Sequence, residues 1–451
     1  MRTLISLLRP SKGEMEPGVA AAAYGVETAA EGAVAAGVAI AKATMPLKAS
    51  WKRIPTNTTL PRSSHSLSIV QGKAYIFGGE EKPREPVDNH MHVFTLSMSD
   101  NDEVDYEKIK PAGADIPLPR VGHTASIVDD RIYVFGGRGG KDMTPLNENG
   151  RVWVLDTRLN QWFALDPAPG SPFPAPRSYH ASASTSHPFS SPRDHPERPT
   201  GVENSGFDDH GTIFIHGGCP ASDRVADVWG FDIASRIWSQ YADAPGPARG
   251  GPCLTFTQER LYRFGGFDGQ KELGGPIQFL HFRVSTFDDA GGKGEMLVAP
   301  RTGVWETVEP PEGTLEPGNR SVAGLLPVTT GQGRNYLLLF LGEKDPSSSG
   351  HDAAGRFWDD VWSFQLRPDG MTAASFKDAT RLLFGAKTAE DSWARVDIPE
   401  TSQTKEVTHP SPRGWFASSQ GQDLDPGSVI LWGGVLDDNS RASDGWTLTI
   451  E

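Results

Sequence analysis

Cysteine is scarce in this sequence. The two cysteines, Cys219 and Cys253, are too few among 451 residues for a fold held together by disulfides, which is common in secreted proteins. This scarcity favours a reducing compartment, and we expect a cytoplasmic protein, with the nucleus as an alternative. Mitochondrial import is less favoured, because the first acids, Glu14 and Glu16, come early in the chain and transit peptides are poor in acids.

Long apolar runs and an excess of positive charge are also missing. No run of about 18 apolar residues occurs, so the sequence predicts no membrane-spanning helix. The formal net charge is −14 at pH 7, whereas nucleic acid and anionic lipid are bound through basic patches. We therefore expect neither nucleic acid nor membrane as a partner. The sequence also lacks a nucleophile elbow, a glycine-rich phosphate loop and a CxxC pair, motifs that would mark common enzyme chemistries.

Glycine and proline, by contrast, are abundant, with 50 and 36 copies, and they stand between short apolar runs as turn residues. One pattern recurs along the chain: an apolar, β-rich run that ends on two glycines. Its copies end at Gly79, Gly137, Gly218, Gly266 and Gly434. A sixth copy at 338–343 has a single glycine, and we align Glu343 with the second glycine of the other copies. Recurrence of one pattern predicts a repeat architecture.

The glycine-ended run is one of four patterns that each occur six times. An arginine and a short apolar strand precede it, as at 119–128, and an alternating strand such as Val152–Asp156 follows it. The fourth pattern is an aromatic residue with an apolar residue three positions later, such as Trp162 and Leu165. Period-two alternation, with many β-branched and aromatic residues, predicts that all four are strands.

The order of these patterns predicts a closed ring. The first copy of the fourth pattern, at Trp51, precedes the first arginine, and the chain ends on a third pattern at 446–450. In a ring the strand at Trp51 would complete the last sheet and leave no exposed edge at the seam. We predict an all-β, six-bladed β-propeller over 48–451, with four antiparallel strands per blade, closed by the N-terminal strand. Residues 1–47 are predicted to be an Ala/Gly-rich tail with marginal helix.

Three features together resemble the kelch repeat: Arg-x-x-His, the apolar strand that ends in Gly-Gly, and the tryptophan beyond an aromatic strand, as at 120–123, 132–137 and Trp162. The resemblance covers 48–451 and implies a kelch β-propeller. Kelch proteins bind protein partners, and some hold acidic peptides with arginines, so the resemblance also implies a protein or acidic peptide ligand. A more distant resemblance is to the nitrile-specifier-type kelch proteins.

The nitrile-specifier and thiocyanate-forming proteins use an iron(II) site with the ligand pattern Glu-x3-Asp-x3-His. This pattern is absent, and the nearest string, Arg84-x3-Asp88-x3-His92, has arginine in place of the glutamate. We therefore expect no cofactor, with iron on another ligand set as the alternative. The remaining metal candidates, for which we favour a structural role, are Asp88, His92, His65, His123 and His180.

Because successive strands of a blade alternate in direction, the loops between strands 2 and 3 share one face with the blade-to-blade loops. Long 2–3 loops are expected at 80–90, 138–150, 267–276, 343–357 and 435–443. The opposite face should carry long loops at 185–210, 285–302 and 368–391, the last with a short amphipathic helix, since apolar residues recur at 3–4 spacing from Ala373 to Leu383. We expect the acids of the 2–3 loops to be solvated: Glu80, Glu81, Asp142, Asp223, Asp227, Asp268, Glu343, Asp345, Asp437 and Asp438.

Six arginines open the first pattern and should ring the channel mouth on the 2–3 face: Arg62, Arg120, Arg177, Arg249, Arg320 and Arg413. A ring of guanidinium groups would bind carboxylates bidentately. The alternative is that each arginine bonds carbonyl groups or a nearby acid within the fold. The predicted function is a monomeric protein–protein interaction scaffold or adaptor that acts through this face. The alternative is a small-molecule enzyme or specifier with a metal-assisted site in the same funnel.

Overall fold

The computed structural model describes residues 46–96, 103–187, 210–287, 295–310, 312–331, 333–349, 353–368, 370, 372–383, 388–399, 408–421 and 424–451. The chain divides into two compact units. Pro46–Asp369 and Glu390–Glu451 form the unit that holds every described strand, and Gly370–Ala389 belongs to the other unit. Almost all of the tail predicted over 1–47 lies outside the described residues.

Six sheets of four antiparallel strands form the blades of a propeller. From inner to outer strand, blade 1 is β2 (Ser66–Val70), β3 (Lys73–Phe77), β6 (Met91–Thr95) and β7 (Asp105–Ile109). Blade 2 is β8 (Thr124–Val128), β9 (Arg131–Phe135), β12 (Val152–Asp156) and β13 (Gln161–Leu165), and blade 3 is β14 (Ala181–Thr185), β15 (Thr212–His216), β16 (Val228–Asp232) and β17 (Ile237–Tyr241). Blade 4 is β18 (Cys253–Thr257), β19 (Arg260–Phe264), β20 (Ile277–Phe287) and β21 (Glu295–Val308). Blade 5 is β22 (Gly324–Thr329), β23 (Asn335–Phe340), β26 (Val361–Gln365) and β27 (Trp393–Arg395), and blade 6 is β28 (Ala417–Gln420), β29 (Ser428–Trp432), β30 (Gly445–Ile450) and β1 (Ala49–Arg53). The predicted six-bladed, all-β fold is thereby confirmed.

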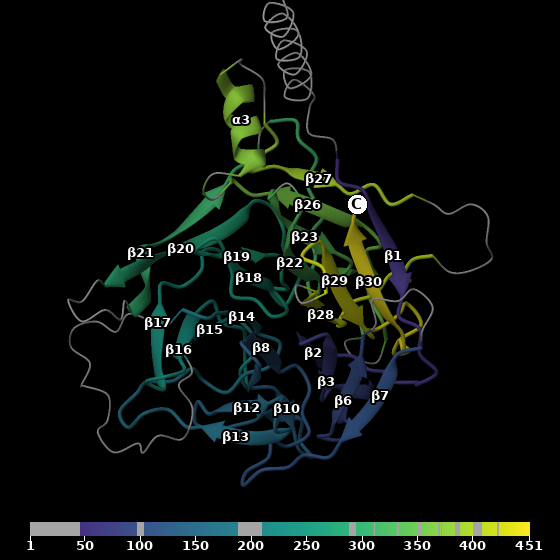
Figure 1. Cartoon of the computed structure of the whole chain (residues 1–451). Coiled ribbons are helices and arrows are strands. Elements are labelled where there is room, and N and C mark those ends of the chain that lie inside the picture. The colour runs from purple at the N-terminus through teal and green to yellow at the C-terminus, as the bar shows by residue number, and fades with distance from the viewer. Residues whose placement is uncertain are drawn as a thin grey trace, which may run out of the picture. The chain divides into compact units, whose positions relative to one another are not determined.

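The blades follow one another around a common axis, with the first strand of each blade innermost (Figure 1). Neighbouring inner strands contact each other in the cyclic order β2, β8, β14, β18, β22, β28 and back to β2. At the seam, β1 pairs with β30, with Ala49 opposite Ile450 and Arg53 opposite Trp446. A strand from the start of the described chain therefore lies in the sheet that its last strands form.

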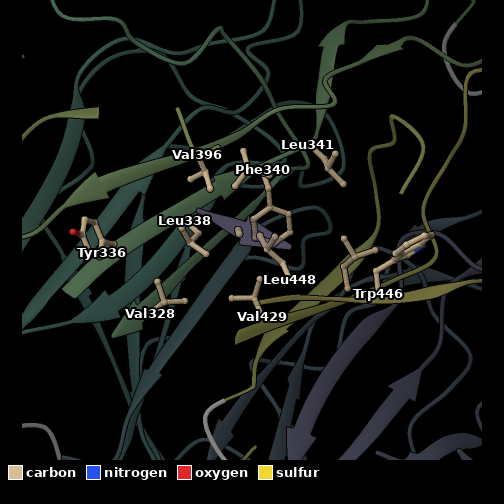
Figure 2. Close-up of a cluster of buried hydrophobic side chains, with 12 residues drawn as sticks. Val328, Tyr336, Leu338, Phe340, Leu341, Val396, Val429, Trp446 and Leu448 are labelled. Atoms are coloured by element: carbon tan, nitrogen blue, oxygen red, sulfur yellow. The ribbon is translucent and has the colours of Figure 1, made fainter. Parts of the chain in front are cut away.

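Aromatic side chains of the outer strands pack against the preceding blade. Trp162 of blade 2 lies 5.1 Å from Phe77 of blade 1, between ring centroids, and Trp238 of blade 3 lies 5.0 Å from Phe135 of blade 2. Burial of roughly 200 Å² per tryptophan at about 25 cal/mol per Å² contributes about 5 kcal/mol to blade packing. Figure 2 shows a cluster of buried apolar side chains shared by blades 5 and 6, which includes Phe340 and Leu448.

The glycine pairs end the second strand of each blade in a left-handed turn. In five blades the first glycine has φ between 62 and 67°, and the second donates its N–H to an arginine carbonyl of the next blade at 2.8 to 2.9 Å. In blade 5 these positions are held by Leu341, with φ 54°, and Gly342, with φ 98°. The alignment of Glu343 with the second glycine was wrong. Leucine can reach the left-handed α region, whereas φ near 100° requires glycine, so the first glycine is the one replaced.

Three of the 2–3 loops contain small two-stranded ladders: β4 (Glu80–Lys82) with β5 (Glu85–Pro86), β10 (Arg138–Gly139) with β11 (Thr144–Pro145), and β24 (Glu343–Asp345) with β25 (Arg356–Phe357). The loop predicted at 285–302 was partly wrong, because β20 continues to Phe287 and β21 begins at Glu295. Residues 188–209 of the 185–210 loop lie outside the described part. Across the described ranges, no helix is long and apolar enough to cross a membrane.

The helix predicted within 368–391 is present as α3 (Ala373–Leu383) in the smaller unit. Thr372 caps its N-terminus, because the Thr372 hydroxyl accepts a hydrogen bond from the N–H of Ser375 at 3.0 Å. The Ser375 hydroxyl accepts in turn from the N–H of Thr372 at 2.7 Å. These reciprocal bonds form a capping box.

Candidate functional site

The six ring arginines are buried, with exposed fractions of 0 to 6%. In every blade Nη1 of the arginine donates to the carbonyl of the first residue of the glycine pair, at 2.7 to 3.1 Å. In five blades Nε donates to the carbonyl two residues earlier in the chain. Each guanidinium therefore fastens the loop before strand 1 to the turn after strand 2.

Four of these arginines also meet an acid that precedes strand 3 of the same blade. The pairs are Arg120–Glu148, Arg177–Asp227, Arg320–Asp360 and Arg413–Asp444, at 2.5 to 2.8 Å. The same carboxylate accepts the indole N–H of a strand-3 tryptophan at 2.7 to 2.9 Å. The acids were missed as arginine partners, although an Asp-x-Trp spacing marks three of them, at 227, 360 and 444. The prediction that Asp227 is solvated was wrong.

Blades 1 and 4 depart from this arrangement. In blade 1, Arg62 Nη2 lies 2.7 Å from His92 Nε2 and 3.8 Å from Asp88. The Nδ1 atom of His92 lies 2.7 Å from the Tyr106 hydroxyl, and Asp88 pairs with Lys108 at 2.6 Å. In blade 4, no described carboxylate bonds to Arg249, and burial lowers its pKa to about 10. The guanidinium groups thus bond to groups within the fold, which is the alternative to ligand binding given above. Ligand binding by this ring stays a prediction.

The three repeat histidines, His65, His123 and His180, are buried with exposed fractions of 4 to 6%. Their ring edges lie against the first glycine of the preceding blade, where a Cβ on Gly78 would come within 2.7 Å of His123 Cε1. Burial lowers the pKa of His65 and of His180 to about 3, so both rings are neutral at pH 7. Within the described ranges, no three His, Cys, Asp or Glu side chains come together as metal ligands.

A cavity of about 420 Å³ opens at the channel mouth. Its lining comes from the 2–3 loops and the blade-to-blade loops, which places it on the face predicted for function. We call its five largest exposed or half-buried lining side chains the mouth site: Arg138, Tyr179, Arg224, Phe267 and Trp415. These residues were absent from the predicted site.

Tyr179 and Trp415 reach the mouth because of a backbone ring. They stand two residues after a ring arginine, and both have positive φ, of 54 and 51°. At this position the N–H of one blade donates to the carbonyl of the preceding blade, as from Tyr179 to Gly122 at 2.7 Å and from Ser64 to Trp415 at 2.9 Å. The residue two positions after each ring arginine carried the signal that would have located these two side chains.

The two arginines of the mouth site are stacked on aromatic rings. The guanidinium carbon of Arg138 lies 5.3 Å from the Tyr179 ring centroid, and that of Arg224 lies 4.9 Å from the Phe267 centroid. Arg138 Nε donates to the Ser178 hydroxyl at 2.8 Å, and Arg224 Nε is buried without a hydrogen-bond partner. Glu343, from blade 5, lines the same cavity. The mouth therefore carries cations from blades 2 and 3 and carboxyl groups from blades 3 and 5, those of Asp223 and Glu343.

A second cavity, of about 510 Å³, is lined by the inner strands and includes Ser126, Ser184 and Gln420. Several of its hydroxyl groups are hydrogen-bonded within the fold. Ser126 donates to Ser182 at 3.0 Å, and Ser184 donates to the carbonyl of Ile127 at 2.7 Å. The mouth site is therefore the better candidate for a charged ligand.

Comparison with known proteins agrees with this architecture. Residues 43–190 match the KLHDC2/KLHL20/DRC7 Kelch-repeats domain. The chain is 26% identical over 410 residues to N-(sulfonatooxy)prop-2-enimidothioate sulfolyase of Thlaspi arvense, covering 88% of this chain and 96% of that protein. It is 25% identical over 236 residues to Kelch domain-containing protein 3 of Homo sapiens, covering 50% of this chain and 53% of that protein. The solved structure of YjhT shares the fold, with a TM-score of 0.53 and 13% identity over 87% of this chain and 96% of that one. The chain therefore combines a six-bladed β-propeller fold with a match to a kelch-repeat domain over residues 43–190.

Proposed function

We propose that this protein is an interaction scaffold or adaptor that binds an acidic segment of a protein partner at the mouth site. The observation that carries the proposal is the pair of stacked arginines, Arg138 and Arg224, at the cavity of about 420 Å³. The six buried ring arginines hold the turns in place and are not the proposed contacts.

The chemistry of the mouth site suits a carboxylate ligand. A guanidinium presents a planar fork of donors that matches a carboxylate, and stacking on an aromatic ring fixes the orientation of that fork. Partial burial strengthens the interaction relative to a fully solvated pair. Tyrosine, tryptophan and arginine are also the residues that most often dominate protein interfaces.

The test is binding of acetylated peptides that each carry two adjacent acidic residues, measured by fluorescence anisotropy at low and high salt. We expect Arg138→Ala and Arg224→Ala each to weaken the best peptide about tenfold, which corresponds to about 1.4 kcal/mol. Arg158→Ala is the matched control, because Arg158 is exposed in the loop between β12 and β13, on the opposite face. The proposal fails if no acidic peptide binds, or if the mouth variants bind as tightly as the control.

A second candidate function is a small-molecule enzyme or specifier with a metal-assisted site in the same funnel. The similarity to the sulfolyase of Thlaspi arvense, over 88% of this chain and 96% of that protein, supports it. The purified protein would be incubated with N-(sulfonatooxy)prop-2-enimidothioate, with and without added iron(II), and the products analysed. Iron-dependent turnover above the buffer rate supports this function, and its absence rejects it.

We propose further that the protein is a cytoplasmic monomer. Light scattering coupled to size exclusion would give a mass near 48.7 kDa for a monomer. Fractionation of the native cell would place the protein in the cytosol, and recovery with nuclei or mitochondria would contradict that location.

A further inference from the structure

Two carboxyl groups lie side by side at the junction of blades 4 and 5. Glu343 directly follows the glycine turn of blade 5 and lines the mouth cavity. Glu272 comes from the 2–3 loop of blade 4, where it pairs with Phe267. Their exposed fractions are 4 and 3%. The prediction that Glu343 is solvated was therefore wrong.

The junction of blades 6 and 1 has the same construction with one decisive difference. Glu80 occupies the position of Glu343, and its backbone pairs with Ser63 as that of Glu343 pairs with Ser321. Arg441 pairs with Val435 as Glu272 pairs with Phe267. Arg441 Nη2 lies 3.0 Å from Glu80 Oε1, and Arg441 Nε donates to the Ser63 hydroxyl at 3.2 Å. Where blades 6 and 1 place a cation, blades 4 and 5 place a second carboxyl group.

The charges around the carboxyl pair do not compensate for that difference. Burial, followed by repulsion from Glu272, raises the pKa of Glu343 to about 9. Burial also raises the pKa of Glu272 to about 7, with Asp268 and Asp345 adding to the negative potential. Ser321 lies beside Glu272, yet neither carboxyl oxygen of Glu272 makes a hydrogen bond of normal geometry. Two buried carboxyl groups that face each other without a balancing positive charge are costly to ionise.

We propose that Glu272 and Glu343, with the Ser321 hydroxyl, receive a cationic group of the ligand, a primary ammonium or a guanidinium, which supplies the positive charge that Arg441 supplies to Glu80 at the equivalent junction. As the cation binds, the O–H bond of the protonated carboxyl group breaks and its proton passes to solvent; no other covalent bond changes. This inference deepens the proposed function: the partner segment would place a lysine or arginine in the carboxyl pair and its acidic residue on Arg138 or Arg224.

The test uses n-butylammonium and methylguanidinium as probes, titrated into the full-length protein and followed by NMR and by calorimetry in two buffers of different ionisation enthalpy. We expect saturable binding that releases protons and that weakens as the pH falls from 8 to 6, because protons compete with the cation. The groups that face the pair are Asp268, Asp345 and Ser321, and their variants would modulate this pH dependence. Glu343→Gln and Glu272→Gln should each weaken binding at least tenfold, and Glu81→Gln, an exposed acid of another 2–3 loop, should not.

Glu272→Arg supplies a sharper variant, because it rebuilds the Arg441–Glu80 arrangement within the chain. We expect it to raise the unfolding temperature and to abolish binding of both probes. Absence of saturable binding to the wild type, or equal binding by Glu343→Gln, overturns the inference, as does saturable binding of Mn²⁺ or Ca²⁺ in place of the organic cations. If acidic peptides bind through Arg138 and the organic cations do not bind, the inference fails alone. If the cations bind and acidic peptides do not, the proposed function fails alone.

Discussion

Removal of the carboxylate of Asp360 should expose how much the buried arginines contribute to stability. Arg320 is fully buried, with an exposed fraction of 0%. Its Nη1 and Nη2 lie 2.7 and 3.2 Å from the two oxygens of Asp360, and one of these oxygens also accepts the Trp362 indole N–H at 2.7 Å. Asp360→Ala therefore leaves a buried guanidinium and a buried indole N–H without their acceptor.

The expected cost can be worked from these contacts. Breaking a buried ion pair on one side costs about 3 to 5 kcal/mol. The lower part of that range applies, because Arg320 keeps its bonds to the carbonyls of Leu341 and Gly318 and its stacking on Trp358 at 5.0 Å. We expect a loss of about 3 kcal/mol. With about 2.1 cal/mol/K of unfolding entropy per residue over about 400 residues, this lowers the unfolding temperature by about 3 to 4 °C.

The assay is urea and thermal unfolding followed by circular dichroism and by tryptophan fluorescence, whose agreement tests two-state behaviour. Asp166→Ala is the matched control, because its pair with Arg151 is exposed, and it should cost under about 1 kcal/mol. The double replacement Arg320→Met with Asp360→Leu should cost less than Asp360→Ala alone, since no charge is left buried. If Asp360→Ala and Asp166→Ala have equal effects, the ring arginines do not depend on their internal partners, and the reasoning is refuted.

Three further predictions concern the turns, the carboxyl pair and the seam. Gly265→Ala should destabilise the protein by at least about 2 kcal/mol more than Gly140→Ala. Both glycines have positive φ, of 66 and 70°, but only at Gly265 would an added Cβ collide with the Arg320 carbonyl. Equal effects in chemical denaturation would show that the contact is unimportant. The pKa of Glu343 is raised to about 9 and that of Glu272 to about 7, from an ordinary value of 4.5. The stability that the protonated pair contributes is therefore complete at a pH below 4.5 and is lost as the pH rises towards 9. Glu343→Gln should therefore gain stability relative to the wild type as unfolding is measured from pH 5 to pH 9, and a constant difference would contradict this. A chain that starts at residue 54 should be less stable and more prone to aggregate than one that starts at residue 46. The reason is that only the shorter chain lacks β1 and leaves β30 as an open edge. Equal light scattering and an equal unfolding temperature for the two chains would argue against a role for β1.

The strands and their order could be read from the sequence because their signals are local. Alternation of side chains with period two marks every blade, and glycine pairs and outer-strand tryptophans mark five blades each. The first copy of the fourth pattern, at Trp51, predicted the pairing partner of the last strand. The same counting placed the 2–3 loops on one face. The alignment of the repeats failed at Leu341, because a pattern with one glycine does not show which of the two turn positions accepts a side chain. The backbone φ of each position decides that question.

The candidate site could be predicted only in its location. Charged residues in loops look solvated in a sequence, and arginines at a repeat position look available for a ligand. The folded structure decides otherwise. Within blade 2 it pairs Arg120 with Glu148. Closure of the ring buries Glu80 against Arg441, which is 361 residues away in the chain.

By itself the sequence determined the number of blades, the order of their strands and the face that bears the mouth, because each depends on short-range periodicity and turn chemistry. The tertiary structure alone decided which charges meet. It brought Arg138 and Arg224 to the cavity and set Glu272 beside Glu343, since contacts between neighbouring blades depend on distances across the ring that no local pattern encodes.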